Sequence, residues 1–368
     1  DHVLAMLRGA MAELRLGNPS ILATDVGPVI TPEAAAGITA HVQAFRSKNA
    51  PVHALPLPDS CANGSFVPPT LIEVTSISEV GQEVFGPVLH VLRYPRAQLA
   101  TVLEDINATG YGLTFGLHTR LDTTVQSVLE HVQAGNLYVN RNTIGAVVGV
   151  QPFGGRGLSG TGPKAGGPLI LRRLLAQVPA LPQIVQGRTP QAMAGWTDWL
   201  RTQGESEAAQ RAHALASQPV TNGQITLPGP VGEQNLYRLG ARGTVLCMAQ
   251  TKVGLYDQIS LALAGGNTAA ILADASLLAI VASLPVSIGQ FVRPVSSAQS
   301  LACSILLSEE DNSAFRATRA LLSAGNGPIV SAYVTKNGLP SIEAVLEEQS
   351  RSINTTAAGG NASLMTLN

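Results

Sequence analysis

The fold class is decided by residues 243–272, which read GTVLCMAQTKVGLYDQISLALAGGNTAAIL. Residues 243–248 form an apolar run of strand length, residues 254–264 have the length and composition of a helix, and residues 268–272 form a second apolar run. The alternation continues downstream, with a helix expected at 277–284, a strand at 302–307, a helix at 311–323 and a strand at 328–334. Such alternation predicts an α/β fold with βαβ units and a parallel sheet.

Upstream of this stretch the pattern mixes helices with short strands. Residues 1–16 predict an amphipathic helix, and Thr31 and Pro32 suit the N-cap and first position of a helix that runs to about Lys48. Further elements are expected as strands at 66–74, 87–94 and 136–140 and as helices at 97–107, 123–134 and 192–216. A change of composition near residues 179–182 marks a domain boundary, and the tail from Ser352 is expected to be extended or a loop.

The composition excludes several classes of protein. The chain has 23 basic and 24 acidic residues, and this balance argues against nucleic acid as a main partner, since binding phosphates needs a basic surplus. Three cysteines, Cys61, Cys247 and Cys303, are too few and too scattered for a disulfide framework or a zinc site, which favours a reducing compartment. The most apolar stretch, residues 277–286, is too short to span a membrane and contains Pro285.

The first candidate site is residues 83–87, EVFGP. The carboxylate of Glu83 could accept hydrogen bonds from two adjacent ribose hydroxyls, and the ring of Phe85 could pack against a flat ring. The same residues would equally suit a surface glutamate that precedes a turn.

The second candidate site is the glycine-rich loop of residues 145–167. Its glycines permit positive φ and leave N–H groups uncovered, so the loop could grip a carboxylate; the alternative is a flexible surface loop. Within it Gly155, Gly157 and Gly160 match the spacing of a dinucleotide fingerprint. We reject this match because no apolar strand precedes it and no amphipathic helix opens at its end.

No other motif points to a catalytic or metal site. Cys247 and Cys303 lie in apolar strands and are expected in the core, while Cys61 lies in a loop rich in Pro, Asn and Gly. The seven histidines show no spacing typical of metal ligands, and no P-loop is present.

Several short motifs, in order and spacing, resemble the aldehyde dehydrogenase superfamily. They are residues 25–28 (DVGP), 66–70 (FVPPT), 83–87 (EVFGP), 111–113 (YGL), 135–140 (GNLYVN), 152–155 (PFGG) and 159–160 (SG). Residues 140–141, 144–146, 151–155 and 160–167 resemble the branch that oxidises L-glutamate γ-semialdehyde, the open form of Δ1-pyrroline-5-carboxylate. The best match within it is the long form of the bifunctional proline utilization A family.

This resemblance divides the chain into three parts. Residues 1–180 would be the C-terminal part of an aldehyde dehydrogenase catalytic domain, residues 181–350 a Rossmann-like domain related to the family's own NAD-binding domain, and residues 351–368 a tail that helps to close a tunnel. The second part is suggested by residues 228–237, 242–247 and 262–268. Gly265, Gly266 and Asn267 could contact a phosphate, but we favour a tight helix end before a strand, because no strand-GxGxxG-helix occurs there.

The resemblance also assigns roles to residues. Glu83 would hydrogen-bond the nicotinamide ribose of NAD and Phe85 would pack near the nicotinamide. Gly145 and Ala146 would offer N–H groups to the substrate's α-carboxylate, and Phe153 would line the aldehyde pocket. FAD is expected only in a proline dehydrogenase domain outside this chain, and the whole protein is expected to be a cytoplasmic homo-oligomer, peripheral at the inner face of the membrane.

The family's nucleophile, in a Gly-Gln-x-Cys stretch, and its base, in a stretch like Glu-Leu-Gly-Gly, are absent from these residues. Both are expected upstream of Asp1, as is the true NAD-binding domain, so the isolated chain is predicted not to oxidise aldehydes. Two alternatives stay open: a non-catalytic module for assembly and for closing the tunnel, and an independent nucleotide-binding module within residues 180–368.

Overall fold

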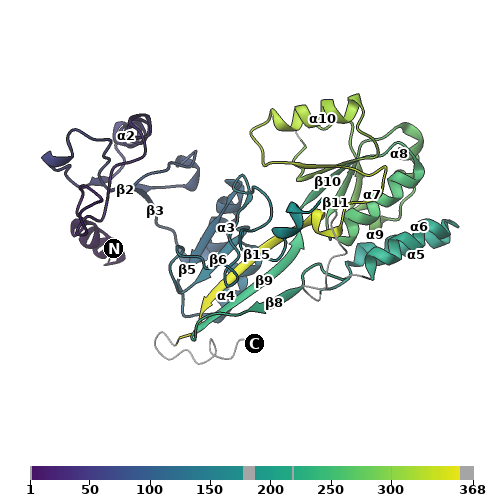
Figure 1. The fold of residues 1–368 in the computed structure, drawn as a ribbon, viewed down its shortest axis with the longest axis horizontal. Coiled ribbons are helices and arrows are strands. Elements are labelled where there is room, and N and C mark those ends of the chain that lie inside the picture. The colour runs from purple at the N-terminus through teal and green to yellow at the C-terminus, as the bar shows by residue number, and fades with distance from the viewer. Residues whose placement is uncertain (1, 177–186, 218, 300, 357–368) are drawn as a thin grey trace. The chain divides into compact units, whose positions relative to one another are not determined.

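The computed structural model describes residues 2–176, 187–217, 219–299 and 301–356 (Figure 1). The chain divides into two compact units, Asp1–Thr109 and Gly110–Asn368, and each is described by itself. Among the described residues, no helix is both long and apolar enough to cross a membrane.

The first unit contains a small sheet with the strand order β1-β2-β3. β1 pairs antiparallel with β2, and β2 pairs parallel with β3. Val42 and Phe45 of α2 pack against Ile72 and Val74 of β2. The described elements of this unit are α1 (His2–Ala12), α2 (Pro32–Ser47), β1 (Val52–Ala54), β2 (Thr70–Val74), β3 (Val88–Leu92) and α3 (Leu99–Ala108), with 3₁₀ turns at Asp59–Cys61, Ile77–Glu79 and Arg96–Gln98.

The start of α2 follows the predicted capping pattern. Thr31 is extended, its hydroxyl oxygen accepts a hydrogen bond from the N–H of Ala34 at 3.2 Å, and Pro32 occupies the first helical position. By contrast, the helix predicted for residues 1–16 ends at Ala12, and none of the residues of α1 is buried. Its apolar side chains are therefore at most partly buried, Leu4 and Met11 among them.

The second unit contains the predicted parallel sheet, with the strand order β12-β11-β10-β13-β14 and every neighbouring pair parallel. This confirms the α/β fold class. The described elements of this region are β10 (Thr244–Met248), α7 (Lys252–Ala264), β11 (Thr268–Ile271), α8 (Ala275–Ala282), α9 (Val286–Gly289), β12 (Val292–Pro294), β13 (Ile305–Ser308), α10 (Ser313–Ser323) and β14 (Ser331–Val334).

Helices cover both faces of this sheet. Val245 and Cys247 of β10 belong to the core cluster that includes α7 and the two helices α5 (Gln191–Thr202) and α6 (Ser206–Ala216). Leu246, which points to the opposite face, packs in a separate cluster with Phe315 of α10. A strand buried on both faces reads as a continuous apolar run, which explains why this region could be predicted.

A second five-stranded sheet has the order β5-β6-β15-β9-β8 (Figure 1). β15 (Leu346–Asn354) lies between β6 and β9, parallel to the first and antiparallel to the second. The other described elements here are β4 (Tyr111–Gly112), β5 (Thr114–Leu117), α4 (Asp122–His131), β6 (Asn136–Val139), β7 (Arg156–Gly157), β8 (Gln224–Leu227) and β9 (Glu233–Ala241), with 3₁₀ turns at Leu171–Leu174 and Ile342–Val345.

This sheet joins parts of the sequence that the predicted domain limits separate. β5 and β6 come from residues 1–180, whereas β8, β9 and most of β15 come from residues 181–350. The expected boundary at residues 179–182 and most of the tail lie outside the described residues, so the domain limits stay a prediction. The beginning of the tail is extended, as expected, because Ser352 to Asn354 complete β15.

Candidate functional site

Glu83 and Phe85 lie on the surface of the first unit. Phe85 is 80 % exposed, and Glu83 makes no hydrogen bond to any described residue. The next two residues lead the chain into β3, and a Cβ atom on Gly86 would come within 2.4 Å of the Ile38 side chain. The turn is therefore tightly packed beneath two outward-facing side chains, an arrangement that suits both cofactor binding and the surface-turn interpretation.

Gly145 and Ala146 lie in the second unit, on an exposed segment that follows β6. Gly145 has a φ of +79°, and a Cβ atom placed on it would meet nothing within 4 Å. In the described part of the chain, no hydrogen bond engages the N–H groups of these two residues. Two adjacent unpaired donors beside an open space are suited to binding a carboxylate.

Phe153 is held in the same loop by its backbone. Its N–H donates to the carbonyl of Ala165 at 3.0 Å, and the N–H of Ala165 donates to the carbonyl of Phe153 at 2.8 Å. A Cβ atom on Gly155 would lie 2.4 Å from the carbonyl oxygen of Ser159, so the glycine is needed for close packing. The residues beside Phe153 are therefore closely packed, whereas residues 142–149 are exposed.

The rejected dinucleotide fingerprint has no helix behind it. Residues 156 and 157 form the short strand β7, which pairs with β4, and the next described regular element is the 3₁₀ turn Leu171–Leu174. A phosphate site of that type needs a helix N-terminus directly after the glycines.

Lys164 is a buried cation that sequence reasoning did not single out. Its side chain is one of the largest fully buried ones, and its Nζ donates to Asn136 Oδ1 at 3.2 Å and to the carbonyl oxygen of Gly154. Loss of hydration lowers the pKa of Lys164 to about 8, an effect that the nearby Glu348 carboxylate opposes. The ammonium group thus ties the chain beside Phe153 to β6.

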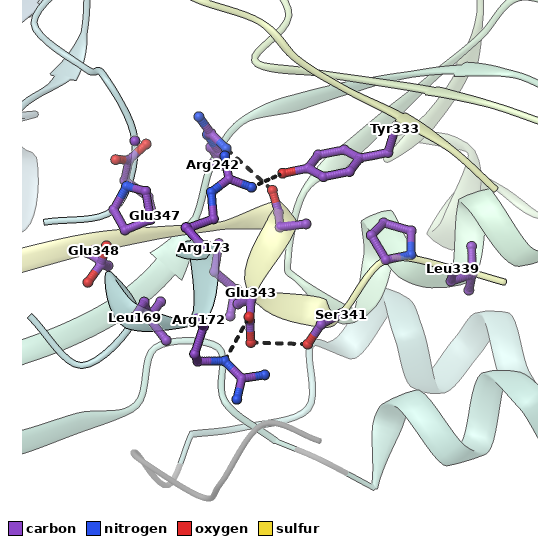
Figure 2. A pocket seen from close by; sticks show the side chains of 15 residues that line it. Leu169, Arg172, Arg173, Arg242, Tyr333, Leu339, Ser341, Glu343, Glu347 and Glu348 are labelled. Carbon is purple, nitrogen blue, oxygen red and sulfur yellow. Dashed lines mark hydrogen bonds and ion pairs between the residues drawn. The ribbon is translucent and has the colours of Figure 1, made fainter. Parts of the chain in front are cut away.

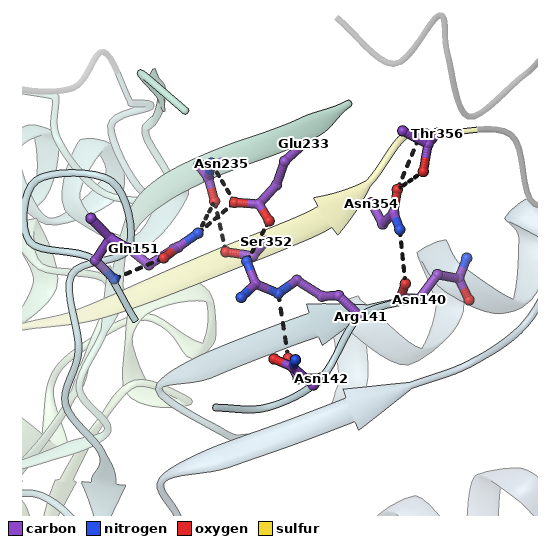
Figure 3. A network of polar contacts seen from close by, with 10 residues as sticks. Asn140, Arg141, Asn142, Gln151, Glu233, Asn235, Ser352, Asn354 and Thr356 are labelled. Atoms are coloured by element: carbon purple, nitrogen blue, oxygen red, sulfur yellow. Dashed lines mark hydrogen bonds and ion pairs between the residues drawn. The ribbon is translucent and has the colours of Figure 1, made fainter. Parts of the chain in front are cut away.

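A polar network holds the loop at Gln151 (Figure 3). Gln151 accepts a hydrogen bond from the N–H of Val147 at 2.9 Å and donates to Glu233 and to Asn235, the latter at 3.3 Å. Glu233 also pairs with Arg141, and Ser352 donates to Asn235 at 2.7 Å. The network therefore links the loop to β9 and β15.

The three thiols are all buried, with exposures of 1 % for Cys61, 0 % for Cys247 and 5 % for Cys303. Cys247 and Cys303 pack in the two apolar clusters of the parallel sheet, which confirms that they belong to the core, and burial raises the pKa of both thiols. Cys61 closes a 3₁₀ turn in the first unit.

Gly265, Gly266 and Asn267 form the expected tight helix end. Gly265 caps α7, Gly266 has a φ of +74°, and β11 begins at residue 268. The side chain of Asn267 accepts hydrogen bonds from the N–H groups of Arg242 and Gly243 at 2.7 and 2.8 Å. The segment is therefore occupied by contacts within the protein.

A cavity of about 370 Å³ lies in the second unit between β14, β15 and the turn at Leu171–Leu174 (Figure 2). Arg172 forms an ion pair with Glu343 at 2.8 Å there, and Arg173 donates to the hydroxyl of Tyr333 at 2.9 Å. Gly162 and Pro163 of the loop 145–167 line it, whereas Glu83, Phe85, Gly145, Ala146 and Phe153 do not. The candidate site is therefore the loop of residues 145–167 in the second unit, with Glu83 and Phe85 as a separate pair in the first.

Comparison with known proteins gives the same family for the first half of the chain. Residues 1–177 match the family described as "Aldehyde dehydrogenase family". The bifunctional protein PutA of Rhizobium meliloti is 45 % identical over 95 % of this chain and 29 % of its own length, and that of Escherichia coli (strain K12) is 43 % identical over 100 % of this chain and 30 % of its own. The 1-pyrroline-5-carboxylate dehydrogenase of Bacillus cereus (strain B4264) is 35 % identical over 46 % of this chain and 32 % of its own.

A solved structure supports the fold over nearly the whole chain. Proline utilization A (PutA) from Corynebacterium freiburgense matches with a TM-score of 0.69 and 23 % identity, over 96 % of this chain and 34 % of that one. The chain thus spans about a third of the length of the relatives that it matches.

Proposed function

Residues 1–177 belong to the aldehyde dehydrogenase family, and from this premise we propose that the chain is part of an NAD-dependent L-glutamate γ-semialdehyde dehydrogenase that produces glutamate in proline catabolism. The choice of substrate is supported by the unpaired N–H groups of Gly145 and Ala146, which lie on the same loop as Phe153. The names of the relatives, PutA and 1-pyrroline-5-carboxylate dehydrogenase, point to the same substrate.

Each site residue has a role in this proposal. Gly145 and Ala146 bind the α-carboxylate and so orient the aldehyde end of the substrate, while Phe153 shields that end from water. Glu83 holds a ribose through its free carboxylate, and the exposed ring of Phe85 packs near the nicotinamide. The exposed, unpaired state of these two side chains fits a bound dinucleotide. Bound NAD would supply the acceptor for the hydride.

The reaction itself needs a thiolate. A thiolate would attack the aldehyde carbon, the hydride would pass to NAD, and a water activated by a general base would hydrolyse the resulting thioester to the acid and the free thiol. The three thiols of this chain are buried, and two of them have raised pKa values, so none suits this role. We therefore assign the nucleophile and the base to another part of the full-length protein.

The family resemblance suggests the other partners. FAD would serve a proline dehydrogenase domain outside this chain, and the whole protein would be a cytoplasmic homo-oligomer. A second function, closing and supporting the site, is favoured by β15, which lies between β6 and β9 and completes the sheet behind the loop.

The isolated chain is expected to form no NADH from L-glutamate γ-semialdehyde, whereas the full-length protein forms it steadily. The measurement is absorbance at 340 nm, with circular dichroism as the control that the isolated chain is folded. Turnover by the isolated chain that disappears in a Cys61→Ala variant would place the nucleophile here and refute the assignment.

Ala146→Pro in the full-length protein is expected to lower kcat/KM for the semialdehyde by about 10- to 100-fold, because a hydrogen bond to a charged group contributes about 1.5–3 kcal/mol. Oxidation of propanal, which has no α-carboxylate, should change little. Ala146→Ser keeps the N–H group and is the matched control. An equal loss with both aldehydes would mean that residue 146 does not bind the carboxylate.

A further inference from the structure

The loop that carries Phe153 is held from behind by two strands far away in the sequence. Gln151 donates to Asn235 on β9, and the carbonyl of Pro152 accepts a hydrogen bond from the hydroxyl of Ser350 on β15 at 2.5 Å. Further along the loop, Lys164 also contacts β15. Strand residues 84 positions downstream on β9 and 184 to 198 positions downstream on β15 therefore determine where this loop lies.

The contact at Lys164 is built around the carboxylate of Glu348 on β15. One oxygen accepts a hydrogen bond from the backbone N–H of Lys164 at 2.8 Å, and the other accepts one from the hydroxyl of Tyr237 on β9 at 2.7 Å. Glu348 is 7 % exposed and Tyr237 is fully buried. Both oxygens of the carboxylate thus have hydrogen-bond partners, at the edge of the cavity that Glu348 also lines.

This carboxylate is connected to Phe153 by a short series of contacts. The N–H that it holds belongs to Lys164, and the next residue, Ala165, forms both backbone hydrogen bonds with Phe153. The side chain of Lys164 donates to the carbonyl oxygen of Gly154, the residue after Phe153. Lys164 and Ala165 together therefore fix the backbone at Phe153 and at the residue that follows it.

Packing alone does not require charged groups at Lys164 and Glu348, whose ammonium and carboxylate have different hydrogen-bond partners. Burying an ammonium and a carboxylate is costly, and apolar residues of similar volume often stabilise a protein equally well. A polar network in which every member is paired instead fixes one arrangement of the groups that it joins. The thioester chemistry of the proposed function depends on the aldehyde lying within a fraction of an ångström of its position for attack.

We propose that Glu348, oriented by Tyr237, is a positioning residue that acts through Lys164 to hold Phe153 against the aldehyde. The inference rests on the proposed function, and it extends that function to strands β9 and β15. These strands then set the affinity for the substrate without contacting it.

The test uses the full-length protein with Glu348→Leu, Glu348→Gln and Tyr237→Phe. Glu348→Leu is expected to raise KM for the semialdehyde about tenfold while KM for NAD stays unchanged. Tyr237→Phe, which removes one hydroxyl and should fold, is expected to act in the same direction to a smaller extent. Glu348→Gln keeps the shape and an acceptor for the N–H of Lys164, so it should restore most of the wild-type KM.

Hydrogen exchange of residues 147–167 provides a readout independent of activity. Both Glu348→Leu and Tyr237→Phe should accelerate exchange there, whereas Tyr256→Phe, which removes a hydroxyl from a buried tyrosine on α7, should not. Unchanged exchange in this loop, or an equal change in both KM values, would overturn the inference. A wild-type protein that does not oxidise the semialdehyde would refute the proposed function instead, and the exchange measurement would still decide whether Glu348 holds the loop.

Discussion

Trp196→Ala is expected to lower the free energy of unfolding of the second unit by about 3–5 kcal/mol, the usual cost of removing a large aromatic side chain from a core. Trp196 lies on α5 and is fully buried. Its ring stacks on Trp199 with a centroid distance of 5.2 Å and meets Tyr256 edge-on at 5.7 Å. Its Nε1 donates to the hydroxyl of Ser260 on α7 at 2.8 Å. The substitution therefore opens a cavity between α5 and the helix that covers the parallel sheet.

Chemical denaturation followed by far-ultraviolet circular dichroism measures this loss. Trp196→Phe keeps a smaller aromatic ring and removes the N–H donor, and Ser260 still donates to the carbonyl of Tyr256. Its cost should be about 1–2 kcal/mol. Val231→Ala, at a fully exposed position, should change nothing. If Trp196→Ala lowers the free energy of unfolding no more than Trp196→Phe does, the contact between α5 and α7 does not form as described.

The parts of the fold that could be predicted are those specified by neighbouring residues. Thr31 and Pro32 define the start of α2 within one turn, and the apolar run at residues 244–248 identifies a strand covered on both faces. β15 was not predicted as a strand. Its sequence, LEEQSRSIN, is mostly polar, and Glu348, Ser350 and Ser352 are nevertheless buried. Their partners lie on β9 and in the loop of residues 145–167, and no local pattern reveals such partners.

The same division holds for the candidate site. Gly145, Ala146 and Phe153 were predicted because short motifs of a family include them. The structure adds what surrounds them: two unpaired N–H groups and a loop held at both ends. Lys164 stands in one of the quoted motifs, but its importance depends on Glu348, 184 residues away. A single sequence does not show a contact between such distant residues.

Asn267 was predicted to end a helix tightly, and its contacts show how much depends on it. Besides the two hydrogen bonds that it accepts, its Nδ2 donates to the carbonyl of Val345 at 2.9 Å and to that of Ala262 at 3.3 Å. The side chain is 2 % exposed, so water cannot replace these partners. One amide group thereby joins the beginning of β10, the end of α7 and the residue before β15.

Asn267→Ala is expected to destabilise the second unit by about 3 kcal/mol or more, because it leaves buried N–H and C=O groups unpaired at about 1–3 kcal/mol each.

Asn267→Asp separates the hydrogen bonds that the side chain accepts from those that it donates. An aspartate still accepts from Arg242 and Gly243, but when ionised it faces two carbonyl oxygens and is buried. Burial and the two carbonyl oxygens would raise the pKa of the aspartate in the folded protein above its value in the unfolded chain. The loss of stability caused by Asn267→Asp should therefore shrink as the pH falls toward about 4. Denaturation of both variants at pH 7 and pH 4, with the exposed Asn142→Ala as the control, measures these effects. A loss below about 1 kcal/mol for Asn267→Ala would mean that the segment tolerates a looser helix end, and the case for a purely structural role of these residues would fail.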